Sequence, residues 1–292
     1  MTFGKTVLEA RKVAPGLHLV STPIGAARDI TLKALDILAG ADILAAEDTR
    51  TLRHLMEIHG IALGGRPMIA YHDHNGSAVR PRLMALLKEG KSVAYASEAG
   101  TPLVADPGYQ LARAAIGEGL AVLAAPGASA VLCALTVSGL PSDRFTFLGF
   151  LPPKSTARKK MLREVKDWQS SLIIYESPHR LLLCLRDMQQ VLGQDRQAAV
   201  CRELTKKFEE VTRGSLNDLA LRFEDKDVKG EIVIVVDRPV VAEVKAEEVQ
   251  TSLREALLTL SVKQASQLVA EQFGLAKRDA YQMALKMGVA DE

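Results

Sequence analysis

The sequence has few cysteines, no long apolar run and no apolar stretch resembling a signal peptide. Its three cysteines, Cys133, Cys184 and Cys201, stand far apart in apolar surroundings. This spacing excludes a metal-binding cysteine cluster and a disulfide framework, and it is typical of small core residues in a reducing compartment. No run of about 18 apolar residues occurs, which argues against a membrane-spanning helix. We therefore expect a cytoplasmic protein without membrane association.

The common nucleotide-binding fingerprints are also missing. Neither the GxxxxGKS/T pattern of a P-loop nor the GxGxxG pattern of a dinucleotide fold is present. The net charge of the 292 residues is only +2, so the overall charge does not indicate a nucleic-acid partner. Apolar residues make up 48% and charged residues 25%, which is typical of a globular protein with two or three domains. Function must therefore be inferred from local motifs.

Strand and helix patterns alternate through the first half of the chain. Short apolar strands are predicted at 17–20, 42–46, 68–71, 93–96 and 120–124, with helices at 31–38, 51–59, 79–88, 107–117 and 130–137. Asp29 is the predicted N-cap of the first helix. Such alternation predicts an α/β domain with a mostly parallel sheet covered on both faces.

A turn cluster, SGLPSD at 138–143, marks a predicted domain boundary. Beyond it we predict a second set of strands at 145–148, 172–175, 198–201, 208–213 and 231–236, with helices at 157–167, 178–192 and 216–223. Three final helices, the last two separated at Gly274, resemble a helix-turn-helix. We therefore predict a loose tail at 1–15, α/β domains at 16–137 and 138–238, and a linker with a helical extension at 239–292.

Three glycine-bearing turns follow predicted strands. They are STPIG at 21–25, SEAGTPLVADPG at 97–108 and APGASA at 125–130. In open α/β sheets, ligands bind beyond the carboxyl ends of the strands, and glycine lets the backbone approach a ligand closely. We expect the three turns to converge on one crevice that holds a small molecule, although STPIG alone also fits an ordinary strand-to-helix turn.

Polar residues close two further predicted strands. Glu47 and Asp48 are adjacent carboxylates that suit proton acceptance or hydroxyl binding, or else the capping of the next helix. The YHDHN motif at 71–75 crowds two histidines and an aspartate, but residues so close in sequence seldom converge on a metal without a distant ligand. We therefore predict no metal there, and a substrate-facing loop and a solvated turn remain as alternatives.

Positive charge concentrates in the second half. Residues 154–166 carry six Lys/Arg against one Glu, a net charge of +5, and the motifs YESPHR at 175–180 and CRELTKKFEE at 201–210 add charged residues. These side chains form either solvated ion pairs or a surface for an RNA backbone. In the second interpretation the RNA contacts are Lys154, Arg158, Lys159, Lys160, His179, Arg180 and Arg202. Residues 241–292 have a net charge of −2, which suits packing or dimerisation at least as well as nucleic-acid binding.

Eight motifs in order resemble the ribosomal RNA small-subunit methyltransferase I family of the tetrapyrrole methylases. They are STPIGAARDI, AAEDTR, YHDHN, SEAGTPLVADPG, PGASA, SGLPSDRFTFLGFLPPK, YESPHR and RELTKKFEE, and the resemblance covers about residues 17–287. It implies the two-domain α/β fold of class III S-adenosylmethionine (SAM) methyltransferases with a small helical extension. It further implies a homodimer that methylates the ribose 2′-hydroxyl of a decoding-centre cytidine in 16S rRNA, within the small ribosomal subunit.

The resemblance also implies which residues contact SAM. In the first domain these are Pro23, Ile24, Gly25, Ser97, Glu98, Ala99, Gly100, Thr101, Ser129 and Ala130, and in the second Glu176, Leu204, Gly230, Glu231 and Ile232. Two positions depart from the family pattern, because Ala26 replaces its usual Asn and Glu98 its usual Asp. The longer carboxylate at Glu98 keeps the charge and moves it by one methylene.

For the chemistry, we hypothesise that Glu47 or Asp48 accepts the proton of the ribose hydroxyl. Arg50 and Lys206 would neutralise nearby phosphate, and His74 is the reserve base. Two rival interpretations are a porphyrin- or corrin-precursor C-methyltransferase and a non-catalytic nucleic-acid-binding protein. The basic segment and the additional tail argue against the first, and the acidic charge of the tail argues against the second.

Overall fold

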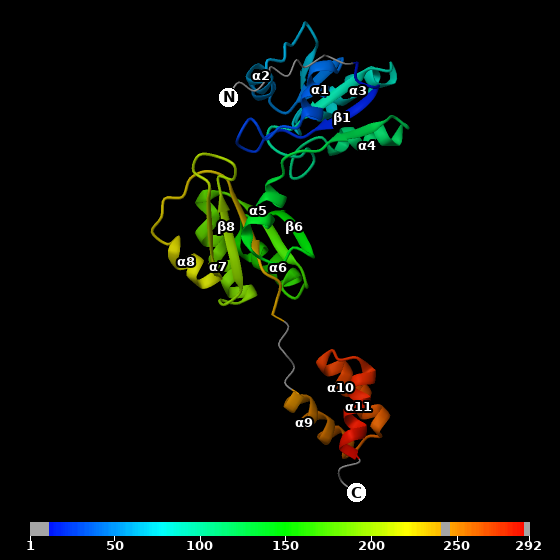
Figure 1. The fold of residues 1–292 in the computed structure, drawn as a ribbon, viewed down its shortest axis with the longest axis vertical. Helices are drawn as coiled ribbons and strands as arrows, with labels where there is room; N and C mark the ends of the chain where they lie inside the picture. Colours follow the sequence, from blue (N-terminus) through cyan, green and yellow to red (C-terminus); the bar gives the residue numbers. More distant parts are fainter. Residues whose placement is uncertain (1–11, 241–245, 289–292) are drawn as a thin grey trace, which may run out of the picture. The chain divides into compact units, whose positions relative to one another are not determined.

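The computed structural model describes residues 12–240 and 246–288, which form two compact units (Figure 1). The first unit, Met1–Pro239, carries two β-sheets, and the second, Val240–Glu292, is helical. Most of the predicted tail, residues 1–11, lies outside the described residues, as do residues 241–245 of the predicted linker.

The first sheet is parallel, as predicted. Its strands are β1 (Gly16–Val20), β2 (Ile43–Ala46), β3 (Met68–Ala70), β4 (Ser92–Ala96) and β5 (Val122–Ala125), in the order β3-β2-β4-β1-β5. Successive strands are joined by α1 (Leu32–Gly40), α2 (Thr49–Ile58), α3 (Gly76–Lys88) and α4 (Tyr109–Gly117). Because the strands run the same way, their carboxyl ends meet at one edge, where loops are free to bind a ligand.

Helices cover both faces of this sheet, which confirms the second part of the prediction. Leu44 and Ala46 of β2 belong to the core formed with α1 and α2. Ile43 and Ala45, which alternate with them, belong to the core formed with α3 and α4. Since side chains alternate across a strand, a sheet buried on both faces needs apolar residues at nearly every strand position.

The start of α1 differs from the prediction. Thr31, rather than Asp29, is the N-cap, and its side chain accepts a hydrogen bond from the Ala34 amide at 3.2 Å. The Asp29 amide instead donates to the Ala26 carbonyl at 2.9 Å. This local turn places Asp29 two residues before the position that a capping side chain must occupy.

The second sheet is mixed rather than parallel. Its strands are β6 (Phe145–Phe150), β7 (Ser171–Glu176), β8 (Gln197–Arg202), β9 (Glu210–Ser215) and β10 (Ile232–Val236), in the order β6-β7-β10-β8-β9. Only the pair of β6 and β7 is parallel among these described strands. One face packs against α6 (Ser155–Val165), α7 (Leu181–Leu192), which follows the short 3₁₀ turn η1 (Pro178–Arg180), and α8 (Leu216–Arg222).

The other face of the second sheet packs against α5 (Ala130–Ser138), the helix that follows the first sheet. Val131, Ala134 and Leu135 of α5 share a core with Ile173 and Val233. The predicted boundary at 137/138 assigns this helix to the first domain, whereas its apolar contacts are with the second sheet. By packing, the change from one sheet to the other therefore falls near Ser129.

The second unit contains α9 (Ala246–Leu257), α10 (Val262–Phe273) and α11 (Lys277–Gly288). Val249, Leu253, Val269 and Ala284 form a small core of its own. Gly274 caps the end of α10 in the left-handed conformation, with φ +64°, which suits glycine. None of the helices in the described ranges is long and apolar enough to cross a membrane.

Candidate active site

The three glycine-bearing turns meet beyond the carboxyl ends of the first sheet. Thr22 and Gly100 exchange two backbone hydrogen bonds, of 2.9 and 3.1 Å, which join the first turn to the second. The Thr101 hydroxyl donates to the Ala128 carbonyl at 3.0 Å and joins the second turn to the third. Gly100 has φ +82°, and a Cβ there would lie 3.2 Å from Ile24 Cγ2, so glycine permits this close packing.

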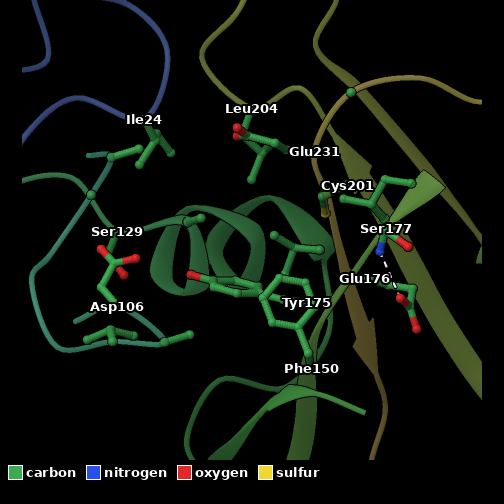
Figure 2. A pocket seen from close by; sticks show the side chains of 18 of the residues that line it. Ile24, Asp106, Ser129, Phe150, Tyr175, Glu176, Ser177, Cys201, Leu204 and Glu231 are labelled. Atoms are coloured by element: carbon green, nitrogen blue, oxygen red, sulfur yellow. Dashed lines mark hydrogen bonds between the residues drawn. The ribbon is translucent and has the colours of Figure 1, made fainter. Parts of the chain in front are cut away.

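A cavity of about 380 Å³ lies between these turns and the second sheet (Figure 2). The first α/β half contributes Ile24, Ala99, Gly100, Thr101, Val104, Ala105, Asp106, Ser129 and Ala130. The second half contributes Phe150, Tyr175, Glu176, Ser177, Pro178, Cys201, Leu204, Gly230, Glu231, Ile232 and Val233. The volume falls within the range of ordinary small-molecule sites, which is about 300–1,000 Å³.

Aromatic side chains and a buried thiol form the apolar wall. The Tyr175 ring contacts Phe147 and Phe150, with centroid separations of 4.8 and 5.6 Å. Its hydroxyl end is directed toward the side of the cavity that carries Asp106 (Figure 2). Burial raises the pKa of Tyr175 and that of the Cys201 thiol to about 12 each, so both groups stay neutral near pH 7. A neutral thiol is a poor nucleophile, and this wall therefore offers packing and no covalent chemistry.

Asp106 lies in the part of the cavity wall that the first α/β half contributes, and its pKa is raised to about 7. Burial is the largest cause, followed by the charges of Glu47 and Glu98. The Oδ2 atom of Asp106 is buried and has no hydrogen-bond partner among the described residues. The pKa of Glu47 is also raised, first by burial and then by Glu98 and Asp73. A carboxylate with a pKa near 7 is suited to exchange a proton with a substrate.

Two loops beside the cavity hold strained backbone. Within the described residues, four non-glycine residues have positive φ: Leu103 (+71°), Ala105 (+59°), Glu203 (+51°) and Thr205 (+62°). The first pair lies in the second turn, and the second pair flanks Leu204 of the opposite wall. Such conformations cost about 1–3 kcal/mol each and persist only where the surroundings enforce them, which happens most often at ligand sites.

Eleven of the fifteen residues predicted to contact the cofactor line the cavity. Pro23, Gly25, Ser97 and Glu98 do not. Ser97 is buried, and its hydroxyl donates to the Gly100 carbonyl at 2.5 Å, so it shapes the second turn. Gly25 faces the loop at 204–206, where a Cβ would lie 2.5 Å from Thr205 Oγ1.

Nine further residues line the cavity and were not predicted as cofactor contacts: Val104, Ala105, Asp106, Phe150, Tyr175, Ser177, Pro178, Cys201 and Val233. Asp106, Ser177 and Tyr175 stand inside motifs that were identified, SEAGTPLVADPG and YESPHR, and reading every polar or aromatic residue of those motifs would have found them. Phe150 likewise stands in an identified motif, SGLPSDRFTFLGFLPPK. Val233 lies at a strand position that carries no such signal, and its place in the wall follows from the pairing of the strands.

The two adjacent carboxylates have different environments. Asp48 is the N-cap of α2, and its Oδ1 accepts from the Arg50 amide at 2.8 Å, which confirms the capping interpretation. Hydrogen bonds from the side chain and the backbone amide of Arg50 are the main cause that lowers the pKa of Asp48 to about 2, so Asp48 is a very weak base. Glu47 is half-buried at the end of β2 and lies outside the cavity lining. His74 is exposed in the connection between β3 and α3.

Lys206, which was predicted to neutralise phosphate, forms ion pairs within the protein. Its Nζ lies 2.9 Å from Glu203 Oε1 and 3.0 Å from Glu231 Oε2. Glu231 lines the cavity, and the Glu231 amide donates to Glu203 at 2.9 Å. In this structure Lys206 therefore fastens the loops at 203–206 and 230–231 to each other.

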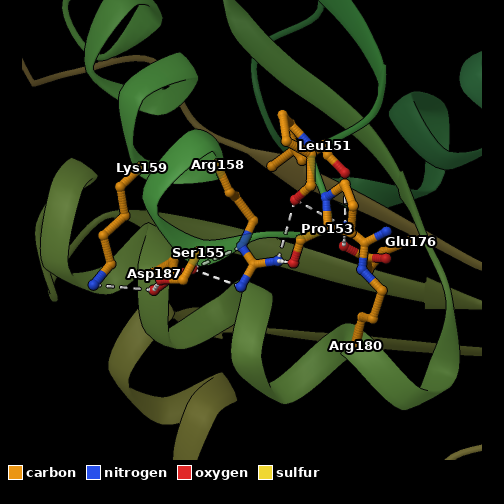
Figure 3. A network of polar contacts seen from close by, with 9 residues as sticks. Leu151, Pro153, Ser155, Arg158, Lys159, Glu176, Arg180 and Asp187 are labelled. Atoms are coloured by element: carbon orange, nitrogen blue, oxygen red, sulfur yellow. Dashed lines mark hydrogen bonds and ion pairs between the residues drawn. The ribbon is translucent and has the colours of Figure 1, made fainter.

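The prediction that Arg158 contacts RNA is wrong, because its guanidinium points into the protein (Figure 3). Its side chain is only 3% exposed, and its Nε and Nη2 lie 2.7 and 2.6 Å from Asp187 Oδ2. Lys159 lies 3.3 Å from the other carboxylate oxygen of Asp187. A buried arginine with a carboxylate partner cannot contact an RNA backbone, so Arg158 is removed from the RNA-binding set.

Arg180 and Arg202 also make internal contacts. Arg180 donates to the Leu151 carbonyl at 2.7 Å and lies 3.3 Å from Glu176 (Figure 3). Arg202 is paired with Glu210 at 3.1 Å. Lys154, Lys160 and His179 are exposed. Across the described residues no group of three or more His, Cys, Asp or Glu side chains is arranged to hold a metal ion.

Comparison with known proteins agrees with this architecture. Residues 16–220 match the model of the Tetrapyrrole (Corrin/Porphyrin) Methylases, and residues 243–288 match that of the RsmI C-terminal HTH domain. A uroporphyrin-III C-methyltransferase from Thermus thermophilus, solved in complex with S-adenosyl homocysteine, has the same fold. It superimposes with a TM-score of 0.54 at 16% identity, covering 76% of this chain and 97% of that one. The chain is thus a member of the tetrapyrrole methylase family.

Named relatives with higher sequence identity indicate a particular group within this family. The ribosomal RNA small subunit methyltransferase I of Mesorhizobium japonicum is 46% identical over 289 residues, which are 97% of this chain and 96% of that protein. The enzyme of the same name from Halalkalibacterium halodurans is 41% identical over 273 residues, covering 91% and 93%. Within the methylases, the chain belongs to the ribosomal RNA small subunit methyltransferase I family.

Proposed function

We propose that this chain transfers the methyl group of SAM to the ribose 2′-hydroxyl of a decoding-centre cytidine in 16S rRNA, acting on the small ribosomal subunit in the cytoplasm. The observation that carries the proposal is the cavity, in which three backbone-rich turns face an apolar wall and Asp106 stands at the edge. When bound, SAM supplies a methyl group activated on a sulfonium ion. The protein has to bind the two reactants, orient them and receive a proton.

The cavity suits a ligand that carries hydroxyl and amino donors, as SAM does. The Glu176 side chain is fully buried; its Oε1 accepts from the Ser177 amide at 2.8 Å, and its Oε2 lies 3.3 Å from Arg180 in an ion pair but accepts no hydrogen bond among the described residues. Asp106 Oδ2 is buried and has no hydrogen-bond partner in the described part of the chain. Leaving a buried acceptor without a donor costs about 1–3 kcal/mol or more for a charged group. A ligand that donates to these oxygens recovers that energy. We assign Glu176 to SAM and Asp106 to the hydroxyl of the methyl acceptor.

Asp106 is the best-placed proton acceptor. A ribose hydroxyl is a weak nucleophile, and a positioned base accelerates such a step by about 10²–10⁴-fold. Asp106 lines the cavity and has a raised pKa, whereas Glu47 lies outside the lining and Asp48 is held by Arg50. We therefore replace the hypothesis that Glu47 or Asp48 is the base. Glu47 becomes a positioning residue, whose charge helps to keep the pKa of Asp106 high.

The test is methyl transfer to small ribosomal subunits from cells that lack this activity, with the modified nucleoside identified by mass spectrometry. Calorimetry measures the binding of SAM separately. Asp106→Asn is expected to lower kcat by about 10²–10⁴-fold with SAM affinity changed less than about threefold. Asp48→Asn is the matched control and is expected to keep kcat. If the product contained no 2′-O-methylcytidine, the proposed reaction would be wrong. If the two variants had equal kcat values, the proposed base would be wrong.

We also propose a homodimer, formed through the outer edge of the first sheet. Strand β5 is an edge strand of this sheet, and it carries the exposed Leu123 (40% exposed) beside α1, which begins with the exposed Leu32 (66%). An exposed apolar edge is a site for pairing with another chain. Light scattering after gel filtration should give twice the chain mass, and Leu123→Lys should shift it toward the monomer. A monomeric wild-type protein at micromolar concentration would exclude the dimer.

A further inference from the structure

A second cavity, of about 370 Å³, lies on the first α/β half and shares Asp106 with the cofactor cavity. Its other walls come from the connection between β3 and α3, the first turns of α3 and the start of α4. They include Tyr71, His72, Gly76, Ser77, Arg80 and Gly108. A ligand in this cavity would therefore reach, at Asp106, the position where the methyl donor is expected.

One end of the second cavity is suited to an anion, because two helices begin there. Neither α3 nor α4 has a side-chain cap at its N-terminus. Asn75 precedes α3, but its Oδ1 accepts from the His72 amide at 2.9 Å and its Nδ2 donates to the Ala70 carbonyl at 3.0 Å. Gly108 precedes α4 with φ +112° and has no side chain to offer. Free amides at a helix N-terminus, together with the positive end of the dipole, bind phosphate groups, and Arg80 adds a full charge.

The other end of the cavity is suited to hydroxyl groups. Asp106 Oδ2 and His72 Nδ1 are buried atoms without a hydrogen-bond partner in the described part of the chain, and both residues line the cavity. Asp73 also lines this cavity, so a bare anion would be repelled by two carboxylates. A ligand that joins an anionic group to hydroxyl groups satisfies both ends.

We propose that the second cavity binds the ribose and the phosphodiester of the acceptor nucleotide, with the phosphate at the starts of α3 and α4 beside Arg80 and a ribose hydroxyl at Asp106. This inference rests on the proposed function and names the substrate subsite for it. The cofactor cavity and the acceptor cavity then meet at one carboxylate. At this junction Asp106 would take the proton of the ribose hydroxyl while the oxygen faces the methyl group directly, as transfer from sulfur to oxygen requires.

The test compares two arginines of the same helix. Arg80 lines the acceptor cavity, whereas Arg82 is exposed and lies outside its lining. With unmodified small ribosomal subunits as the probe, Arg80→Ala is expected to raise the KM for subunits about tenfold and to leave the SAM dissociation constant unchanged. Arg82→Ala should change the KM less than about twofold. The slope of log affinity against log salt should fall by about one for Arg80→Ala, because one phosphate contact is lost.

Two further variants guard against a purely structural effect. Arg80→Lys keeps the charge and should recover most of the affinity, and Ser77→Asp should weaken subunit binding by placing a negative charge at the start of α3. Filter binding of subunits to each variant gives a readout that does not depend on methyl transfer, so the subsite is decided even if the proposed reaction is wrong. Equal subunit affinities and equal salt slopes for Arg80→Ala and Arg82→Ala would overturn the inference.

Discussion

Arg158 and Asp187 form a buried two-point ion pair that joins helix α6 to helix α7. The guanidinium contacts Asp187 Oδ2 through Nε at 2.7 Å and Nη2 at 2.6 Å, and both side chains are less than one-tenth exposed. Ser155 donates to the other oxygen at 2.9 Å. The pair therefore fixes the helix that carries the exposed basic residues, although it does not contribute to the basic surface itself.

Removing Arg158 should destabilise the protein strongly. Arg158→Met leaves the carboxylate of Asp187 buried with Ser155 and Lys159 on one oxygen and no cation on the other, among the described residues. The loss of one partner of a buried pair costs about 3–5 kcal/mol. Lys159→Ala is the matched control, because Lys159 is more exposed and its change should cost less than about 1 kcal/mol. Urea unfolding of both variants measures these free energies.

The double variant Arg158→Met with Asp187→Leu separates the pair from its surroundings. Since both charges are then absent, its stability should lie much closer to the wild-type value than that of Arg158→Met alone. A double variant as unstable as the single one would show that the packing of α6 and α7, rather than the isolated charge, determines the loss.

Gly25→Ala should weaken SAM binding by tenfold or more. The added Cβ would lie 2.5 Å from Thr205 Oγ1 and 3.0 Å from the Leu204 carbonyl, so the first turn and the loop at 204–206 must move apart. Overpacking of this kind costs about 1–3 kcal/mol. Gly117→Ala, at a position with nothing within 4 Å, should leave the SAM affinity unchanged. Calorimetry decides, and equal affinities would show that the spacing of these two loops does not matter for binding.

The rate should depend on pH through Asp106. Its pKa is raised to about 7, so the ionised form needed to accept a proton predominates only above that pH. With wild-type protein, kcat/KM should rise about tenfold per pH unit below 7 and level off above it. Besides burial, the charges of Glu47 and Glu98 raise the pKa of Asp106. Burial, together with the charge of Asp106, in turn raises the pKa of Tyr95 and Tyr175, so both tyrosines stay neutral across this range. Glu47→Gln should move the inflection to lower pH.

The pH dependence of the free energy of unfolding is a second test of the raised pKa of Asp106. Because its folded-state pKa lies above the usual value, the native state holds this proton more tightly than the unfolded chain does. The contribution to stability is present below about pH 4 and is lost as the pH rises to about 7. Asp106→Asn should therefore stabilise the protein against urea at pH 8 and change little at pH 4. A constant difference between the two proteins across this range would contradict the raised pKa.

Removal of residues 240–292 should leave a folded protein that binds SAM. The helical unit has its own core around Val249, Leu253, Val269 and Ala284. Among the described residues, those that line the cofactor cavity all belong to the first unit. Unfolding midpoint and SAM affinity should stay near the full-length values, whereas methyl transfer to subunits should fall if the extension contacts RNA. Loss of SAM binding in the shortened chain would show that the extension supports the cavity.

The sequence allowed the first sheet and the glycine-bearing turns to be predicted, because their signals are local. Alternating apolar runs define the parallel strands, and the glycines mark their ends. The antiparallel pairs of the second sheet carry no comparable local signal, since strand direction depends on which strands become neighbours. The wrong prediction for Arg158 also has a long-range cause. Arg158 belongs to a basic segment in the sequence, and its partner Asp187 lies 29 residues further on.

Asp106 shows the corresponding limit for the site. The residue stands in an identified motif, but its importance comes from burial and from the charges of Glu47, which follows β2, and of Glu98, which stands in the same turn. Neither the burial nor the approach of Glu47 is visible from its neighbours in the sequence. By contrast, Glu47 and Asp48 are conspicuous as a pair, and the structure separates them into a half-buried group and a helix cap.

The left-handed backbone of Leu103, Ala105, Glu203 and Thr205 has a consequence for how a ligand is received. Neighbouring packing already forces these loops into a shape that a free peptide would rarely adopt. Their conformational freedom is therefore lost when the chain folds, and little remains to be lost on association. We expect SAM to bind to a preformed, rigid site. Its association rate should then depend on solvent viscosity only as far as diffusion does.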